Sequence, residues 1–251
     1  MRNTYSSEID ASPEYVLAVL RDEHRQAVEV DGECDPDIDL TFDSTVADWR
    51  IANDLLPAKQ LGRALNESWA LSLSDTDWRN VLTPPRKRTL RDVTNLIALH
   101  TTRTQLQPLQ IAGTSCLPAA AFLAIKDCLA ADVVDVNGIA PSTPLHEYTR
   151  RHWLTFIQRI SRLAPGALPP IAVVSRADDA NTAIGCLGAL LTIAGMFLLK
   201  SAPFVPVLGM LLLLITTANS FRIRSHPLDK VAFGDLRTFR DLSVCIAKSA
   251  G

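Results

Sequence analysis

Two long runs of uncharged, mostly apolar residues dominate the hydropathy pattern of the chain. The first covers residues 180–199 and the second covers 203–221, and Lys200 is the only charged residue between Ala180 and Phe221. About 20 apolar residues let a helix cross the hydrocarbon core of a bilayer. The pattern therefore predicts a hairpin of two transmembrane helices. The alternative is a helical hairpin buried in a soluble bundle, but buried helices usually contain apolar runs of only about 10–14 residues.

The charges that flank the two runs predict their orientation. Arg176 precedes the first run, Arg222, Arg224 and Lys230 follow the second, and the connection carries only Lys200. Lysine and arginine are in excess on the cytoplasmic side of membrane proteins. We therefore expect an integral membrane protein with both termini in the cytoplasm.

Amphipathic patterns predict helices in the rest of the chain. In residues 13–28 the apolar positions Tyr15, Val16, Val19 and Leu20 form one stripe, and apolar residues recur every fourth position in residues 58–69. Capping sequences open further helices near residues 46, 75 and 90. Because no segment alternates between apolar and polar residues as a strand would, the fold class expected is all-α, with a first helical module at residues 12–100.

A second helical module is predicted beyond a polar linker. Residues 101–116 lack strong periodicity and are interpreted as the linker. The second module comprises residues 117–171 and 223–250, and the predicted membrane hairpin interrupts it. Its last two helices are expected at residues 148–163 and 235–248.

The two modules share sequence motifs, which indicates an internal repeat. Residues 89–98 and 238–247 carry Thr, Arg, Asp, Ile and Ala at equivalent positions. Upstream, residues 43–49 parallel 141–148, with Ser44 matched to Ser142. The motifs lie further apart in the second module, by about the length of residues 172–222. The second module is therefore interpreted as a copy of the first with the hairpin inserted before its last helix.

Composition narrows the chemistry that is expected. The chain has 251 residues, a formal net charge of −2 and five cysteines. The charge argues against general nucleic-acid binding, which needs a basic surface. The cysteines show no metal-ligand spacing and their number is odd, which favours free thiols in a reducing compartment. No phosphate-binding loop, nucleophile elbow or dinucleotide-binding turn is present, so neither a cofactor nor a metal is expected.

A few titratable residues remain as candidates for chemistry. His146, Glu147 and His152 do not have the spacing of a zinc-binding HExxH helix, and surface histidines are the favoured interpretation. Residues 29–39 carry an acid at every second position, which is typical of a calcium loop or of a solvated loop; the EF-hand glycine and closing glutamate are missing. Cys34 lies in this loop, where neighbouring acids are expected to raise its pKa.

Basic residues are the best candidates for contacts with other molecules. Arg86–Arg88 with Arg91 form one cluster, which either faces lipid head groups or is an ordinary solvated surface. The second cluster is closer in sequence to the predicted membrane helices and is the preferred candidate for contacts with head groups or a partner. Its residues are Arg150, Arg151, Arg159, Arg162, Arg222 and Arg224.

Short motifs of the first module resemble those of acyl carrier proteins. They are residues 34–38 (Cys-Asp-Pro-Asp-Ile) in the long loop, 64–69 (Ala-Leu-Asn-Glu-Ser-Trp) at the end of the second helix, 73–78 (Leu-Ser-Asp-Thr-Asp-Trp) at the start of the third and 89–92 (Thr-Leu-Arg-Asp) in the last helix. The resemblance covers residues 13–98 and, more weakly, 118–168 with 223–248. It implies two small helical bundles that dock other proteins.

The sequence departs from this family at the position that carries the prosthetic group. The serine of the family's Asp-Ser-Leu motif bears phosphopantetheine, and the motif here falls on Asp54-Leu55-Leu56. Leucine has no hydroxyl to modify, and in the second copy the same count reaches residues 148–150, Tyr-Thr-Arg. A thioester carrier is therefore not expected. Bacterial membrane proteins with a split module and paired membrane spans are also similar.

These observations predict a non-enzymatic, membrane-tethered scaffold or adaptor that presents carrier-like modules to a protein partner. An alternative is an auxiliary subunit of an acyl- or lipid-handling membrane system that mimics an acyl carrier protein. A membrane enzyme is a third possibility, for which His146, Glu147 and His152 would have to converge with other polar groups. The expected partners are the lipid bilayer and a protein, not a nucleic acid.

Overall fold

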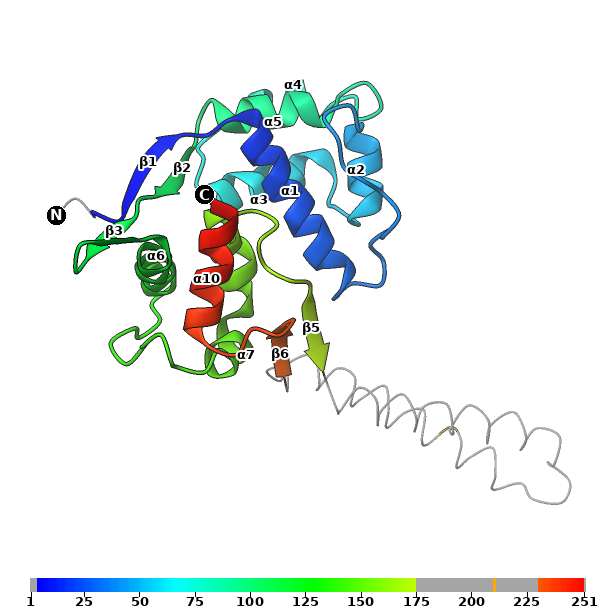
Figure 1. Cartoon of the computed structure of the whole chain (residues 1–251). Coiled ribbons are helices and arrows are strands. Elements are labelled where there is room, and N and C mark those ends of the chain that lie inside the picture. Colours follow the sequence, from blue (N-terminus) through cyan, green and yellow to red (C-terminus); the bar gives the residue numbers. More distant parts are fainter. Residues whose placement is uncertain (1–3, 175–209, 211–229, 251) are drawn as a thin grey trace, which may run out of the picture. The chain divides into compact units, whose positions relative to one another are not determined.

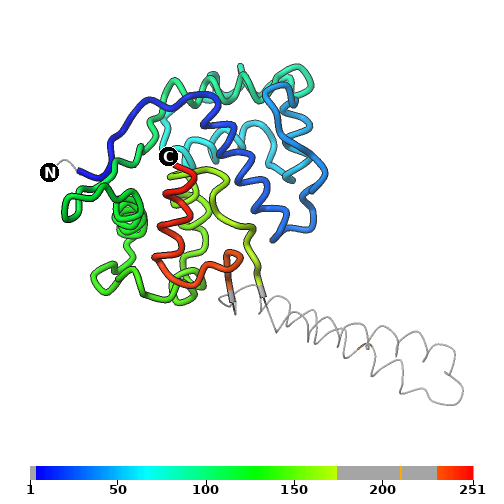
Figure 2. The backbone as a smooth tube through the Cα atoms, in the orientation of Figure 1, coloured from blue at the N-terminus to red at the C-terminus, as the bar shows by residue number. Residues whose placement is uncertain are grey.

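The computed structural model describes residues 4–174, 210 and 230–250 of the chain (Figure 1). These residues form helices and short strands, and Figure 2 shows the path of the backbone. In chain order the elements are β1 (Ser6–Asp10), α1 (Pro13–Val28), α2 (Val46–Ala52), α3 (Ala58–Trp69), α4 (Asp75–Leu82), α5 (Leu90–Ala98), β2 (Thr102–Leu106), β3 (Leu109–Ile111), β4 (Thr114–Cys116), α6 (Leu117–Ala131), α7 (His146–Thr155), η1 (Phe156–Ile160), η2 (Ser161–Leu163), β5 (Ile171–Val174), β6 (Lys230–Phe233) and α10 (Phe239–Ala250).

The predicted all-α fold class is wrong, because the described residues also form three two-stranded sheets. β1 pairs antiparallel with β2 from Ser6–Leu106 to Asp10–Thr102, β3 pairs antiparallel with β4, and β5 pairs with β6. Three of the strands lie in residues 101–116, the segment predicted as a linker. Residues of β1 and β2 are half-buried or exposed except Leu106, and neither strand has the apolar–polar alternation by which a half-buried strand is recognised.

The prediction of an integral membrane protein is corrected as well. Among residues 4–174, 210 and 230–250, no helix has the length and apolar character needed to cross a bilayer. α1, with 16 residues, is shorter than the roughly 20 that a span requires, and it carries charged residues. The two predicted transmembrane helices, 180–199 and 203–221, lie outside the described residues.

The first module has the predicted helices around one apolar core. α1 packs against α5, and α3 packs against α4. α1 and α3 have the predicted bounds, and the core includes the predicted apolar positions of both helices. Gly62 lets α3 approach α4 closely, because a Cβ at residue 62 would lie 2.8 Å from the Cβ and Cγ of Trp78.

The second module is built around the equivalent pair of helices, since α6 packs against α10 as α1 packs against α5 (Figure 1). The predicted helix at 148–163 is present but irregular. α7 has a non-helical backbone at His152, and it continues as a π-helical turn, η1, and a short 3₁₀ turn, η2. Both modules belong to the same compact unit of the chain.

A small backbone motif holds the start of the last helix in the first module. Thr45 and Thr89 form an isolated antiparallel bridge. The Val46 amide donates to the Arg88 carbonyl at 2.8 Å, and the Leu90 amide donates to the Ser44 carbonyl at 2.9 Å. The bridge ties the segment before α2 to the N-terminus of α5.

The same motif recurs in the second module. Pro144 and Thr238 form the isolated antiparallel bridge there. The Leu145 amide donates to the Arg237 carbonyl at 2.9 Å, and the Phe239 amide donates to the Thr143 carbonyl at 3.2 Å. The segment before α7 is thus tied to the N-terminus of α10 as the segment before α2 is tied to α5.

These bonds correct the register of the sequence repeat by one residue. The equivalent of Ser44 is Thr143 and not Ser142. Both hydroxyls accept from the amide three residues upstream, Thr41 to Ser44 Oγ at 2.8 Å and Ala140 to Thr143 Oγ1 at 2.9 Å. Serine and threonine are interchangeable in this turn, because each supplies one hydroxyl acceptor.

The last helices of the two modules bury the same positions. Each position in α5 that faces the core has a buried counterpart in α10, and one of them is a hydroxyl residue in both helices. The pairs are Leu90 and Phe239, Val93 and Leu242, Thr94 and Ser243, Ile97 and Ile246, and Ala98 and Ala247.

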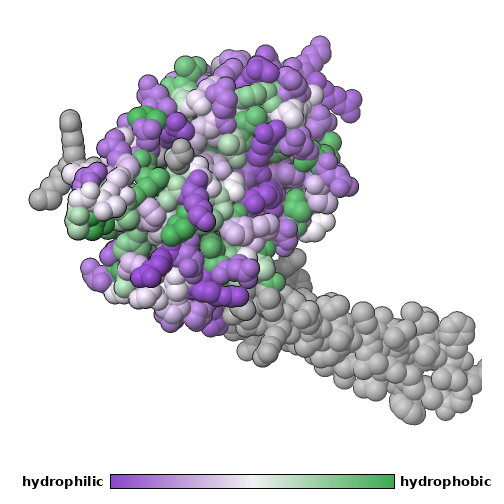
Figure 3. All heavy atoms as spheres, in the orientation of Figure 1, coloured by the Kyte–Doolittle hydropathy of each residue, from purple (hydrophilic) through white to green (hydrophobic). Residues whose placement is uncertain are grey.

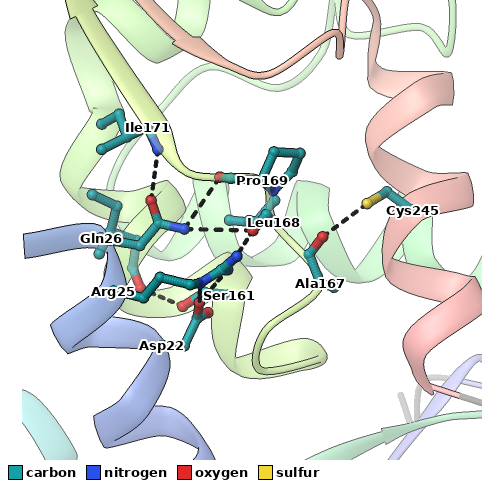
Figure 4. Close-up of polar contacts among 10 residues, drawn as sticks. Asp22, Arg25, Gln26, Ser161, Ala167, Leu168, Pro169, Ile171 and Cys245 are labelled. Carbon is teal, nitrogen blue, oxygen red and sulfur yellow. Dashed lines mark hydrogen bonds and ion pairs between the residues drawn. The ribbon is translucent and has the colours of Figure 1, made fainter. Parts of the chain in front are cut away.

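Side chains of α1 bind the segment that leads into β5 (Figure 4). The Gln26 amide group donates to the Pro169 carbonyl at 3.2 Å and accepts from the Ile171 amide at 2.8 Å. Arg25 donates to the Leu168 carbonyl and forms an ion pair with Asp22 at 2.6 Å. Gln26 is almost fully buried. Its hydrogen bonds to Pro169 and Ile171 therefore join the two modules in the interior of the protein.

Candidate functional site

The arginines predicted as contact residues separate into two places. Arg150 and Arg151 line one pocket, and Arg159 and Arg162 line another. Arg159 is ion-paired with Asp132 at 2.8 Å, and the two side chains are 53% and 27% exposed. Arg222 and Arg224 lie outside the described residues. The described arginines therefore do not form the single contact surface that the sequence predicted.

The pocket around Arg162, which we call the arginine pocket, has a volume of about 440 Å³. Its walls come from α1 and α3 of the first module, from β2, and from α6, η1 and η2 of the second module. The residues that matter most for its chemistry are Tyr15, Trp69, Arg103, Cys128, Arg159 and Arg162.

Arg162 is held in place from several sides. Its guanidinium donates to Glu23 at 2.9 Å, to the Ser68 carbonyl at 2.8 Å and to Ser68 Oγ at 2.8 Å. The guanidinium carbon also lies 4.1 Å from the ring centroid of Trp69, a cation–π distance. The Tyr15 hydroxyl donates to the Arg162 carbonyl at 2.9 Å. This one arginine thus joins η2 to α1 and α3.

Replacing Arg162 by alanine is expected to lower the free energy of unfolding by about 2–3 kcal/mol, because charged hydrogen bonds and a stacked cation are lost together. Arg159→Ala is the matched control from the same helical segment. Its ion pair with Asp132 is more exposed and should contribute less than about 1 kcal/mol. Urea unfolding of both variants measures the difference. Equal losses would show that the contacts of Arg162 add nothing to those of an exposed pair.

Three N–H groups around the arginine pocket are buried without a hydrogen-bond partner. They are Trp69 Nε1, Arg103 Nε and Arg162 Nε, and we call them the unpartnered donors. In the part of the chain that the structure describes, the only other buried side-chain atom of this kind is Asp22 Oδ2. An unsatisfied buried donor costs about 1–3 kcal/mol. Three of them around one pocket therefore require an explanation.

Burial raises the pKa values of two weakly acidic side chains of the pocket, Tyr15 and Cys128. Desolvation raises the pKa of Tyr15 to about 12, and the nearby Arg103 and Arg162 offset this only in part. Desolvation likewise raises the pKa of the Cys128 thiol to about 12. Both groups therefore stay protonated at neutral pH, and Cys128 is not an activated nucleophile.

His146 and His152, for which surface positions are the favoured interpretation of the sequence, both line the pocket that contains Arg150 and Arg151. His146, Glu147 and His152 line it together with Arg150 and Arg151, and its volume is about 600 Å³. Across the pocket are residues 133–135. No group of three or more His, Cys, Asp or Glu in the described residues could hold a metal ion, so these two histidines and one glutamate do not form a metal centre.

The first module carries exposed apolar and acidic residues in the acidic loop and around the end of α2. The amide of Asp35 donates to the carbonyl of Ala52 at 2.9 Å, which places the acidic loop beside the end of α2. Desolvation, and then the carboxylates of Asp31, Asp54 and Glu33, raise the pKa of Cys34, so these acids surround one thiol. We define the acidic corner as Val30, Asp31, Glu33, Asp35, Ile51, Asp54 and Leu56.

Large apolar side chains are exposed in the acidic corner. Val30 is 42% exposed, Ile51 70% and Leu56 50%. The face over α1 and α2 in Figure 3 is mainly hydrophilic, with hydrophobic residues between. Leu55 lies in the short loop before α3. A contiguous apolar patch with a polar rim is one mark of a protein-binding surface.

The acidic loop itself contributes to turns. The Glu33 amide donates to Asp31 Oδ1 at 3.0 Å, and the Asp37 amide donates to Asp35 Oδ1 at 3.0 Å. The second module repeats the latter turn, with the Asn137 amide donating to Asp135. Two of the alternating acids, Asp31 and Asp35, are thus explained by local turns.

Comparisons with protein-family models, with curated proteins and with solved structures found no match for this chain.

The arginine pocket was not predicted as a unit. The sequence marked Arg159 and Arg162 but assigned Trp69 only to the core, and it placed Arg103 in the linker. Trp69 and Arg162 lie far apart in the chain and meet only because the second module packs on the first. Trp69, at the end of an apolar stripe, was a usable signal for a polar site. A buried indole N–H normally needs a hydrogen-bond acceptor.

Proposed function

We propose that this protein is a non-enzymatic adaptor that binds a protein partner at the acidic corner of its first module. The observation that supports this most directly is the exposure of Ile51 and Leu56 among four carboxylates. Burying a leucine or isoleucine side chain contributes about 1.5–3 kcal/mol, and charges at the rim select the partner.

The chemistry of the corner also indicates the partner. Asp31, Glu33, Asp35 and Asp54 complement lysine and arginine side chains. Arg50, which precedes Ile51 in α2, donates to the Leu56 carbonyl at 3.0 Å. The partner is therefore expected to present an apolar side chain flanked by basic residues, as on one face of a basic amphipathic helix.

The chemistry of the thiols supports a role without catalysis. Burial raises the pKa of Cys34, Cys128 and Cys245, so none of these three is poised as a thiolate. A carrier function is not proposed, because Leu55 offers no atom to which phosphopantetheine could be attached.

Changing Ile51 to arginine tests the proposal, since it removes an apolar contact and repels a basic partner. Partner protein retained on the immobilised full-length chain is expected to fall about tenfold or more. Leu99→Arg is the matched control, because Leu99 is 79% exposed in the same module but lies beside the N-terminal end of α1. Quantitative mass spectrometry of the retained proteins measures both variants.

The dependence of partner retention on salt concentration tests the same surface independently. Retention by the wild-type chain should weaken as ionic strength rises, because exposed charge pairs are screened. A partner lost equally from Ile51→Arg and Leu99→Arg, or retained by both, would contradict the proposed surface.

A further inference from the structure

We propose that the arginine pocket is a binding site for a carboxylate group, and that the unpartnered donors are its ligand-binding atoms. The inference is independent of the proposed adaptor function, because the acidic corner lies in a different part of the first module. It rests on the convergence of three donors, on the charges of the pocket and on its size.

The convergence of donors is the first argument. Trp69 Nε1, Arg103 Nε and Arg162 Nε belong to three residues, from α3, β2 and η2, that line the same pocket. All three donate and none accepts, so one acceptor-rich ligand satisfies them together. A carboxylate accepts about four hydrogen bonds through its two oxygens. Its binding would remove the cost of leaving buried donors unsatisfied.

The charges favour a singly charged ligand. Arg159 and Arg162 already face Asp132 and Glu23, at 2.8 and 2.9 Å. Arg103 forms no ion pair with any residue that the structure describes, and it stacks on the Tyr15 ring, with 5.6 Å between the guanidinium carbon and the centroid.

Acidic residues that line the pocket limit the negative charge of a ligand that can bind there. Glu67 and Asp127 also line the pocket. Their negative charges repel a dianion such as phosphate more strongly than a carboxylate, which carries a single negative charge. One arginine without an ion pair matches one negative charge. This balance separates a carboxylate from a phosphate.

The size and the apolar walls indicate what the carboxylate is attached to. A volume of about 440 Å³ lies in the range of small-molecule sites. Trp69, Ala131 and Leu163 supply apolar surface beside the donors. A short aliphatic acid and the C-terminal carboxylate of a peptide share the chemistry that fits.

Entry requires one side chain to move. The three donor nitrogens are covered in this structure, so a ligand reaches them when Arg103 turns away from Tyr15. Arg103 is the side chain best able to turn, because stacking holds it and no ion pair does. Arg162, with four contacts, stays in place.

The experiment follows the indole N–H of Trp69 by NMR in the full-length chain labelled with ¹⁵N-tryptophan. The chain has four tryptophans, and Trp69→Phe assigns the signal. The signal is expected to move downfield and saturate as butyrate is added, because the N–H gains an acceptor. Trp78 is the internal control, since its Nε1 already donates to Asn66 at 2.9 Å.

Two comparisons identify the source of the carboxylate. Butyrate tests a free acid, and a tripeptide with a free C-terminus tests a peptide end, with the amidated tripeptide as its blank. Saturable movement with either carboxylate supports the site and names the source. No movement with both, or equal movement with chloride or phosphate at matched ionic strength, overturns the proposal.

A variant ties the response to the pocket. Arg103→Gln is expected to weaken carboxylate binding about tenfold or more, because it removes the charge that the ligand neutralises. Arg79→Gln, an exposed arginine at another pocket, should leave binding unchanged. An unchanged affinity in Arg103→Gln, with the Trp78 signal in its native position, also overturns the proposal.

Discussion

Replacing Phe239 by alanine is expected to lower the free energy of unfolding by about 3–5 kcal/mol. Phe239 is fully buried at the start of α10, and its ring meets that of Tyr148 edge to face at 5.3 Å and 81°. The variant loses this contact and leaves a cavity beneath the backbone bridge of the second module. Urea unfolding followed by circular dichroism measures the change.

The equivalent position of the first module provides the comparison. Leu90→Ala empties the same site at the start of α5 and should cost about 2–5 kcal/mol. Leu154→Ala is the surface control, since Leu154 is half exposed and should change stability by less than about 0.5 kcal/mol. A loss below about 1 kcal/mol in Phe239→Ala would show that this ring is not part of a close-packed core.

Cys128 is expected to react with iodoacetamide on the order of a thousandfold more slowly than an ordinary thiol at pH 8. Desolvation raises its pKa from the usual 9.0 to about 12, and Asp127 and Asp132 act in the same direction. The thiolate, which is the reacting species, is therefore scarce in the folded chain. Mass spectrometry of peptides after timed labelling measures the rate.

Labelling in denaturant supplies the control for Cys128. Once the chain is unfolded the thiol loses its apolar surroundings, and its rate should rise to that of the other cysteines. A native rate within about tenfold of the unfolded rate would mean that the thiol is accessible and ionises normally.

The helices could be predicted from the sequence because their signals are local. The stripe of Tyr15, Val16, Val19 and Leu20, opened by Ser12 and Pro13, specifies α1 with its observed bounds. A capping box, in which Ser74 and Asp77 satisfy each other's amides, opens α4. Each of these features lies within one or two helical turns, where side-chain spacing alone sets the outcome.

The strands could not be predicted in the same way. β1 and β2 are joined by pairing across about a hundred residues, and Glu8 accepts from the hydroxyls of Thr102 and Thr104 at 2.8 Å. A two-stranded ribbon with little buried surface leaves no alternating pattern in either strand. Its stability comes from a partner that the local sequence does not reveal.

The two candidate sites differ in the same way, because one is formed by residues close in sequence and the other by residues from distant segments. Ile51, Leu56 and the acids of the loop are close in sequence, and one backbone hydrogen bond, from the Asp35 amide to the Ala52 carbonyl, brings the loop to the end of α2. The arginine pocket needs Trp69, Arg103 and Arg162 to meet, and each comes from a different segment. Only the packing of η2 against α1 and α3 brings them together.

The sequence by itself determined the helices of both modules and their relationship as repeats, because caps, apolar spacing and matching motifs are local properties of the chain. The tertiary structure alone decided the small sheets, the one-residue register of the repeat and the arginine pocket. These depend on hydrogen bonds and burial between distant segments, such as Arg162 with Glu23 and Ser68. Contacts of that kind have no periodic signature, since their free energy arises only when the modules exclude water between them.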